Sequence, residues 1–125
     1  LSDGVSRNLA GLCIFEFIMT FTLMFVICAV ALDVKGSARQ YAPLVIGFTY
    51  AACMYCEGPY TGGSMNPART LSAAIVFNDF TGMWVSLIAM FGGAVCGAFA
   101  YKATFNIDRP DSAAATSRSI VSQYV

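Results

Sequence analysis

The sequence contains no histidine, a single tryptophan and few charged residues. Charged side chains make up 11% of its 125 residues, against about 25% in a typical soluble protein, whereas 58% are hydrophobic. Without histidine, histidine-based catalytic triads and most metal sites are excluded. The seven basic and seven acidic residues balance, and no basic run indicates binding to nucleic acid. The composition therefore predicts a membrane protein that is not an enzyme.

All five cysteines lie within apolar stretches of the sequence. Cys53 and Cys56 form a C-x-x-C pair, which elsewhere indicates a metal or redox site. The chain offers no second pair of ligands, so we interpret these thiols as small apolar side chains that fill helix interiors. We expect no disulfide framework, no metal and no cofactor.

Three long stretches are almost free of charge and predict three transmembrane helices, over residues 11–32, 40–56 and 80–101. At about 1.5 Å per residue, the first would extend about 33 Å, enough to cross the hydrocarbon core of a bilayer. The second is at the short end of what can span. Glu16 is the one charged residue inside the first stretch, and a carboxyl group at that depth is expected to be paired or functional.

The basic residues predict the orientation in the membrane. Lys35 and Arg39 follow the first predicted span, and three further basic residues follow the last span, at positions 102, 109 and 118. Because basic residues favour the cytoplasmic side, we expect the N-terminus outside and the C-terminus in the cytoplasm. Residues 103–125 read as a polar cytoplasmic tail.

The stretch "TGGSMNPART", residues 61–70, interrupts the apolar pattern. The glycines at 58, 62 and 63, together with Pro59, are expected to break the preceding helix. Asn66 and Pro67 then form a strong helix start, since asparagine caps free amides and proline suits the first helical position. The predicted helix Pro67–Phe77 would be about 16 Å long, which is half a bilayer. Irregular backbone at such a depth is tolerated only where protein buries it or water lines it.

Asn66 and Arg69 lie one turn apart on the same side of this short helix. Together with the positive end of the helix dipole, they would place an amide donor and a fixed cation toward one lumen. Such a lumen would repel cations and protons, whereas a neutral molecule that forms hydrogen bonds could pass.

The residues "TGGSMNPAR" (61–69) resemble the second Asn-Pro-Ala box of the aquaporins, the major intrinsic proteins. Residues 16–33, 42–54 and 92–101 are similar to the fourth, fifth and sixth transmembrane helices of that family, with the tonoplast type most similar by eye. The resemblance implies an all-α membrane protein with three transmembrane helices and one re-entrant half-helix. Residues 1–102 would form the second of the two inverted repeats of an aquaporin.

The resemblance also implies roles for individual residues. Asn66, Pro67 and Ala68 would form the box at the pore centre, and Arg69, Gly63 and Met54 would line the outer constriction. A constriction of these residues implies a passive channel for water, with ammonia and hydrogen peroxide as further solutes. Thr70 and Ala74 stand where glycerol channels carry an aspartate and a basic residue, which favours the water type.

Two further roles follow from the resemblance. Glu16 would hold the re-entrant loop by accepting hydrogen bonds from backbone amides around residues 62–65. Gly93 and Gly97 form a G-x-x-x-G pair that permits close contact between helices, either within one protomer or between the protomers of a homotetramer.

The sequence also departs from the family in several respects. The first repeat, with its own Asn-Pro-Ala box, is absent and is expected upstream or on a separate chain. Glu57 replaces a small residue and is interpreted as a solvated charge at the outer vestibule. Tyr50, one turn before Met54, could narrow or block the pore. The alternative to a channel is therefore a structural or scaffold subunit of a plasma or vacuolar-type membrane, without transport.

Overall fold

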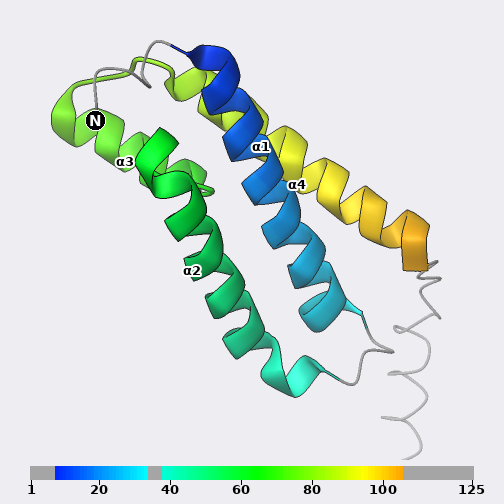
Figure 1. Ribbon diagram of the computed structural model, residues 1–125. Helices are drawn as coiled ribbons and strands as arrows, with labels where there is room; N and C mark the ends of the chain where they lie inside the picture. Colours follow the sequence, from blue (N-terminus) through cyan, green and yellow to red (C-terminus); the bar gives the residue numbers. More distant parts are fainter. Residues whose placement is uncertain (1–7, 34–37, 106–125) are drawn as a thin grey trace, which may run out of the picture.

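The computed structural model describes residues 8–33 and 38–105, and over these ranges the protein is all α-helical (Figure 1). A π-helical turn at Cys28–Leu32 extends the first helix, and a short 3-10 turn at Arg39–Tyr41 precedes the second. The α-helices are α1 (Leu9–Ile27), α2 (Ala42–Thr61), α3 (Pro67–Phe77) and α4 (Met83–Phe105). The predicted all-α fold is confirmed. α4 continues to Phe105, and the remainder of the expected tail lies outside the described residues.

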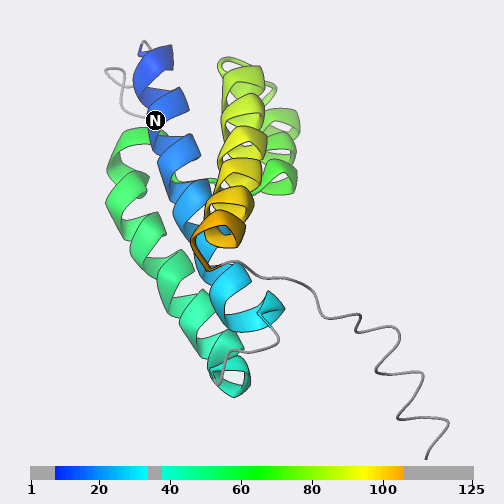
Figure 2. The same ribbon diagram turned by 90° about the vertical axis from the view of Figure 1, so that its right-hand side faces the viewer.

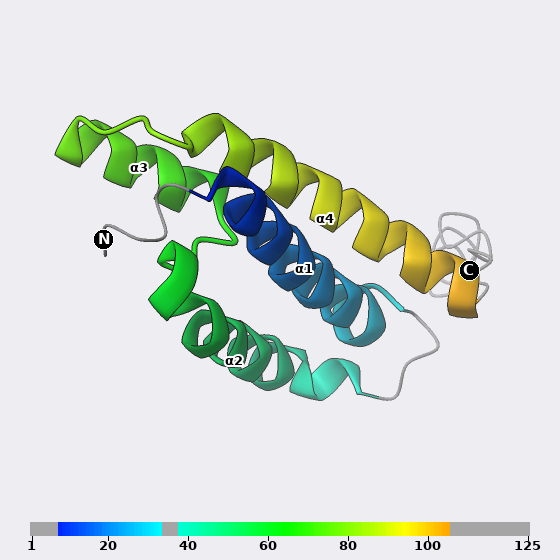
Figure 3. The ribbon, with the colours of Figure 1, turned by 45° about the horizontal axis from the view of Figure 1, so that its top comes forward.

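α1 lies at the centre of the helix arrangement. It packs most extensively against α4 and on its other side against α2, whereas α3 packs against α4 (Figures 2 and 3). α3 begins near the middle of α1 and α4. Met65 and Pro67, at its start, line the same cavity as Thr20 of α1 and Met90 of α4. The loop after α3 returns to the start of α1, where Gly82 approaches Leu12.

The contact between α1 and α4 is made at two glycines. A Cβ atom at Gly97 would lie 2.6 Å from the carbonyl oxygen of Phe21, and one at Gly93 would collide with the carbonyl oxygen of Phe17. These distances leave no room for any side chain, so the two backbones touch directly. The prediction that this glycine pair permits close helix contact is confirmed, and the contact is within one chain.

Replacing Gly97 with alanine is expected to destabilise the protein by about 1–3 kcal/mol, because the added methyl group forces α4 away from α1. The matched control is Gly47→Ala on α2, where a Cβ would meet nothing within 4 Å. That control should be neutral or slightly stabilising, since alanine favours helix more than glycine does. Thermal unfolding in detergent micelles compares the two variants, and equal unfolding temperatures would contradict the backbone contact.

α2 continues further than the sequence predicted. We expected Gly58 and Pro59 to break the helix, but it runs through both residues to Thr61. Pro59 cannot donate a helical hydrogen bond to the carbonyl of residue 55, and only two further residues of helix follow it. The helix ends instead at Gly62, whose left-handed conformation (φ 86°) turns the chain back and suits glycine.

α3 has the predicted bounds, Pro67–Phe77, and ends at Asn78 in the left-handed conformation. The turn that leads to α4 is closed by Asp79, whose Oδ1 accepts a hydrogen bond of 2.9 Å from the backbone N–H of Thr81. Hydrogen bonds from the backbone and side chain of Thr81 lower the pKa of Asp79 below its ordinary value.

The pKa of Asp79 predicts a small pH dependence of stability. A carboxyl group with a lowered folded-state pKa stabilises the fold above its unfolded-state pKa, and this stabilisation is lost as the pH falls through the folded-state pKa. We therefore expect the free energy of unfolding of the native protein to fall at acid pH, and we expect a smaller fall in Asp79→Asn. Unfolding measured across acid pH checks this, and NMR titration of the Asp79 carboxyl carbon should give a midpoint below that of an ordinary aspartate.

Within the described residues, two helices are long and apolar enough to cross a membrane, Leu9–Leu32 and Met83–Phe105. α2, which we also predicted as a span, does not reach the same apolarity. Much of the surface is nevertheless apolar, with strongly exposed aromatic side chains on α2, α3 and α4 at Phe48, Tyr55, Phe77, Trp84 and Phe99.

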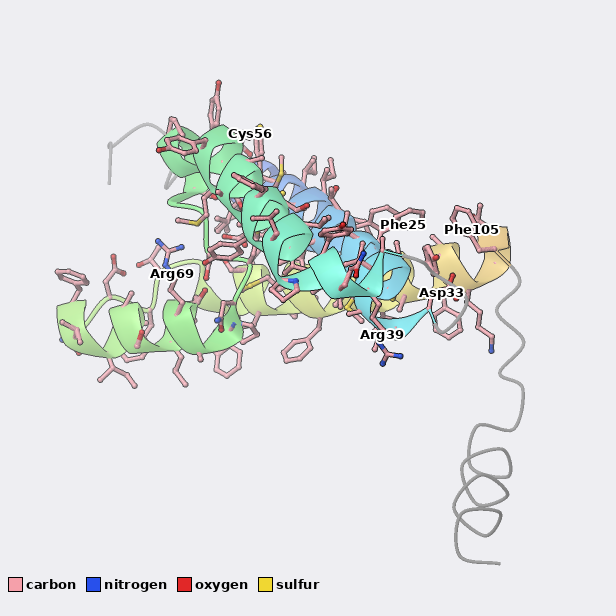
Figure 4. All side chains as sticks on the ribbon, turned by 90° about the horizontal axis from the view of Figure 1, so that it is seen from below. Phe25, Asp33, Arg39, Cys56, Arg69 and Phe105 are labelled. Atoms are coloured by element: carbon pink, nitrogen blue, oxygen red, sulfur yellow. The ribbon has the colours of Figure 1, made fainter. Side chains whose placement is uncertain are left out.

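The end of the molecule opposite α3 is closed by an aromatic cluster (Figure 4). Tyr101 packs against Phe25 and Phe105, with ring centroids 5.2 and 4.7 Å apart respectively. Its hydroxyl donates a 3.0 Å hydrogen bond to Asp33, which follows the π-helical turn. This contact ties the end of α1 to the end of α4.

Candidate functional site

The site is built around the N-terminus of α3. Asn66 has an extended backbone (φ −142°), and its Oδ1 accepts hydrogen bonds from the backbone N–H groups of Ala68 (2.9 Å) and Arg69 (3.4 Å). Pro67 takes the first helical position, where no N–H is needed. Because the side-chain oxygen of Asn66 caps the helix, its NH₂ group is left as the donor that an exposed ligand would meet.

Arg69 extends from α3 toward α2 (Figure 4). Its Nη2 donates a 3.2 Å hydrogen bond to the carbonyl oxygen of Gly62, and its Nη1 lies 3.5 Å from the sulfur of Met54. A Cβ at Gly63 would lie 3.2 Å from the same sulfur. The structure thus brings together Arg69, Met54 and Gly63, with a fixed orientation for the guanidinium group.

Glu16 anchors the loop that precedes α3. Its side chain is 1% exposed, and its two oxygens accept hydrogen bonds from the backbone N–H groups of Ser64 (3.3 Å) and Met65 (3.0 Å). Met65 has a positive φ of 47°, which a side chain adopts only at a cost, so the loop needs an external hold. These hydrogen bonds join the loop to the middle of α1.

Ser64 and Thr70 take part in the site through their hydroxyl groups, a role that the sequence analysis assigned to neither residue. The hydroxyl of Ser64 donates to the carbonyl oxygen of Asn66 at 2.9 Å and forms a short hydrogen bond with the hydroxyl of Thr70. The pair connects the loop to the first turn of α3. Its only sequence signal was the presence of two hydroxyl residues around an Asn-Pro pair.

Glu57 corrects an expectation from the sequence. It was interpreted as a solvated charge, but its side chain is 0% exposed. It lies one turn after the buried Cys53, on the same side of α2. It accepts a 2.8 Å hydrogen bond from the hydroxyl of Thr61. The sequence could not show this, because the prediction ended the helix before the turn that buries Glu57.

Tyr50 is half-buried on α2. Among the described residues, the side-chain hydrogen bonds of Arg69 go to Met54 and Gly62 and none goes to Tyr50. A cavity of about 390 Å³ lies between the start of α1, the end of α2 and the α3–α4 pair. Its polar lining includes Glu16, Thr61, Ser64, Arg69 and Thr70.

Two long apolar helices, with a short helix whose polar N-terminus lies near their middles, are the pattern of a helical membrane protein. The family comparison is specific: residues 2–101 match the model of the family described as Major intrinsic protein. The chain belongs to this family, whose members are channels and not enzymes.

Named relatives agree with this membership. The chain is 44% identical to Nodulin-26 from Glycine max over 108 residues, and this aligned stretch covers 86% of this chain and 40% of that protein. It is 43% identical over 95 residues to Aquaporin NIP1-2 from Oryza sativa (76% of this chain, 31% of that protein). It is 41% identical over 97 residues to Aquaporin TIP2-2 from Zea mays (76% and 38%). The chain therefore spans between 31% and 40% of the length of these relatives.

Proposed function

We propose that the protein forms a passive channel for water and other small neutral solutes. The observation that carries this proposal is the fixed position of Arg69, beside Met54 and the carbonyl oxygen of Gly62 at the polar start of α3. A cation held at this place beside an amide donor repels cations and protons, and it still offers hydrogen bonds to water. Ammonia and hydrogen peroxide are further candidate solutes, because Met54 and Gly63 make a less polar constriction.

The channel function needs an architecture larger than the described helices. α1, α2 and α4 would each cross the membrane, and α3 would be a re-entrant half-helix whose N-terminus points to the membrane centre. A second, inverted repeat with its own Asn-Pro-Ala box would close the pore, and four such units would assemble. We place the C-terminus in the cytoplasm and the protein in a plasma or vacuolar-type membrane. Relatives named Aquaporin support this arrangement.

Osmotic shrinkage of proteoliposomes tests the proposed function. The protein is purified from its native membrane, with whatever chain completes it, and is compared with empty liposomes. Fast shrinkage with a low activation energy is expected. Shrinkage no faster than bare lipid, from protein shown to be folded by circular dichroism, would overturn the proposal. The scaffold alternative predicts that second outcome, and no observation on the described residues favours it.

A further inference from the structure

Glu57 presents a problem that the channel function does not explain. One carboxyl oxygen accepts the hydrogen bond from Thr61, whereas the other, Oε2, is buried and has no hydrogen-bond partner within the described residues. An unpaired carboxylate oxygen in an apolar interior is costly, and native proteins rarely retain one. The surroundings of Oε2 must therefore supply its stabilisation.

The neighbour of Glu57 is a second buried carboxyl group. α1 and α2 are in contact at this level, where the rings of Phe15 and Tyr60 stack with centroids 5.0 Å apart, and the carboxyl groups of Glu16 and Glu57 interact across this contact. Both oxygens of Glu16 accept backbone hydrogen bonds, so Glu16 acts as the acceptor of the pair. Two adjacent carboxyl groups cannot both remain ionised in a site of low dielectric, because their charges repel strongly. With one proton between them, the same pair forms a strong charge-assisted hydrogen bond.

The remaining charges do not remove the need for a proton. Arg69 on α3 attracts Glu57 from a distance, but its hydrogen bonds go to Met54 and Gly62. On α2 the titratable groups within one turn are the buried Cys53 thiol and the exposed side chains of Tyr55, Cys56 and Tyr60. The titratable residues of α4, at positions 96, 101 and 102, all lie in its second half, away from this end.

We propose that Glu16 and Glu57 bind a single proton between them, and that this proton fastens α2 to α1 above the loop of residues 62–65. In this arrangement the Glu57 carboxyl donates to Glu16, and the Thr61 hydroxyl donates to Glu57. Uptake of the proton from solvent forms the O–H bond of Glu57 and its hydrogen bond to Glu16, and no other bond is made or broken.

The proton-binding pair acts on the site through the loop. Thr61 receives a 3.3 Å hydrogen bond from the backbone N–H of Gly63, Gly62 accepts from Arg69, and Glu16 holds the two residues that follow. Loss of the proton would leave two negative charges, on Glu16 and Glu57, beside the loop of residues 62–65. Their repulsion would make the position of the Arg69 side chain less fixed. This consequence, unlike the proton binding, rests on the proposed channel function.

Infrared spectroscopy tests proton binding without transport. The native protein should show the carbonyl stretch of a protonated carboxylic acid at neutral pH, shifted in D₂O, and Glu57→Gln should remove it. Asp79→Asn, which removes an exposed carboxyl group, is the matched control and should leave the band unchanged. Absence of the band from the folded native protein would overturn the proposal. Loss of the band on addition of sodium or calcium would also overturn the proposal, because a metal cation and not a proton would then bridge the two carboxyl groups.

Permeability measured against pH tests the consequence. As the pH rises, water permeability of the native protein should fall severalfold. In Glu57→Gln it should stay flat, because the amide donates to Glu16 at every pH. Equal pH profiles in both proteins would overturn control by the bound proton. Absence of water permeability at every pH, with the infrared band intact, would overturn the channel function and leave the proton site standing.

Discussion

Replacing Glu16 with leucine is expected to destabilise the protein by about 3 kcal/mol or more, since it leaves two backbone N–H groups unpaired, one on a buried residue and one on a half-buried residue. The affected groups are those of Ser64 and Met65. Without this hold, the strained loop should leave the middle of α1, and transport should be lost together with stability. Thermal unfolding in detergent and liposome shrinkage measure the two effects on the same preparation.

Thr20→Val is the matched control for Glu16→Leu. Thr20 lies one turn further along α1, is 7% exposed, and its hydroxyl has no hydrogen-bond partner among the residues that the structure describes. Valine has a similar shape and removes a buried hydroxyl that is unpaired there, so the control should be neutral or stabilising. If both variants unfold at the same temperature, Glu16 does not hold the loop.

Replacing Arg69 with valine is expected to change selectivity more than water flux. The guanidinium group fills the space beside Met54 and provides the fixed cation of the site. Its removal should widen the constriction and raise urea or glycerol permeability at least about tenfold, which corresponds to about 1.4 kcal/mol off the barrier. Proton leakage, followed with a pH-sensitive dye inside the liposomes, should rise as well.

Two controls separate size from charge in the Arg69 experiment. Arg69→Lys keeps the charge but loses the planar fork, so proton exclusion should persist while urea permeability rises. Arg39→Val removes a basic residue at the opposite end of the described helices and should change neither quantity (Figure 4). Unchanged urea and proton permeability in Arg69→Val would contradict the assignment of Arg69 to the constriction.

The short helix was the most predictable part of the fold. Asn66 and Pro67 determine its start through local chemistry, since one caps the free amides and the other fits the first turn. The glycine pair of α4 was predictable for a similar reason, because close backbone contact requires glycine whatever the partner. Such features depend on a few neighbouring residues, and a sequence shows them directly.

The features that were missed depend on tertiary context. The end of α2 follows from the left-handed Gly62 and not from Pro59, and sequence alone does not rank two such signals. The burial of Glu57 follows from that extra turn. The π-helical turn at Cys28–Leu32 has no sequence signal that we recognised, and it precedes the Asp33 contact with Tyr101. In each case, packing between distant segments decides the outcome.

The backbone contact between α1 and α4 has a consequence for how this sequence can vary. Any amino acid at position 17 or 21 supplies the same carbonyl oxygen to the contact, so these positions tolerate exchange as far as the contact is concerned. At Gly93 and Gly97, every other amino acid adds an atom where none fits. A deep mutational scan should therefore find that substitutions are tolerated on the α1 side of the contact and not on the α4 side. We expect no second mutation on α1 to rescue the change, because the nearest atoms of α1 at both glycines are backbone atoms of Phe17 and Phe21.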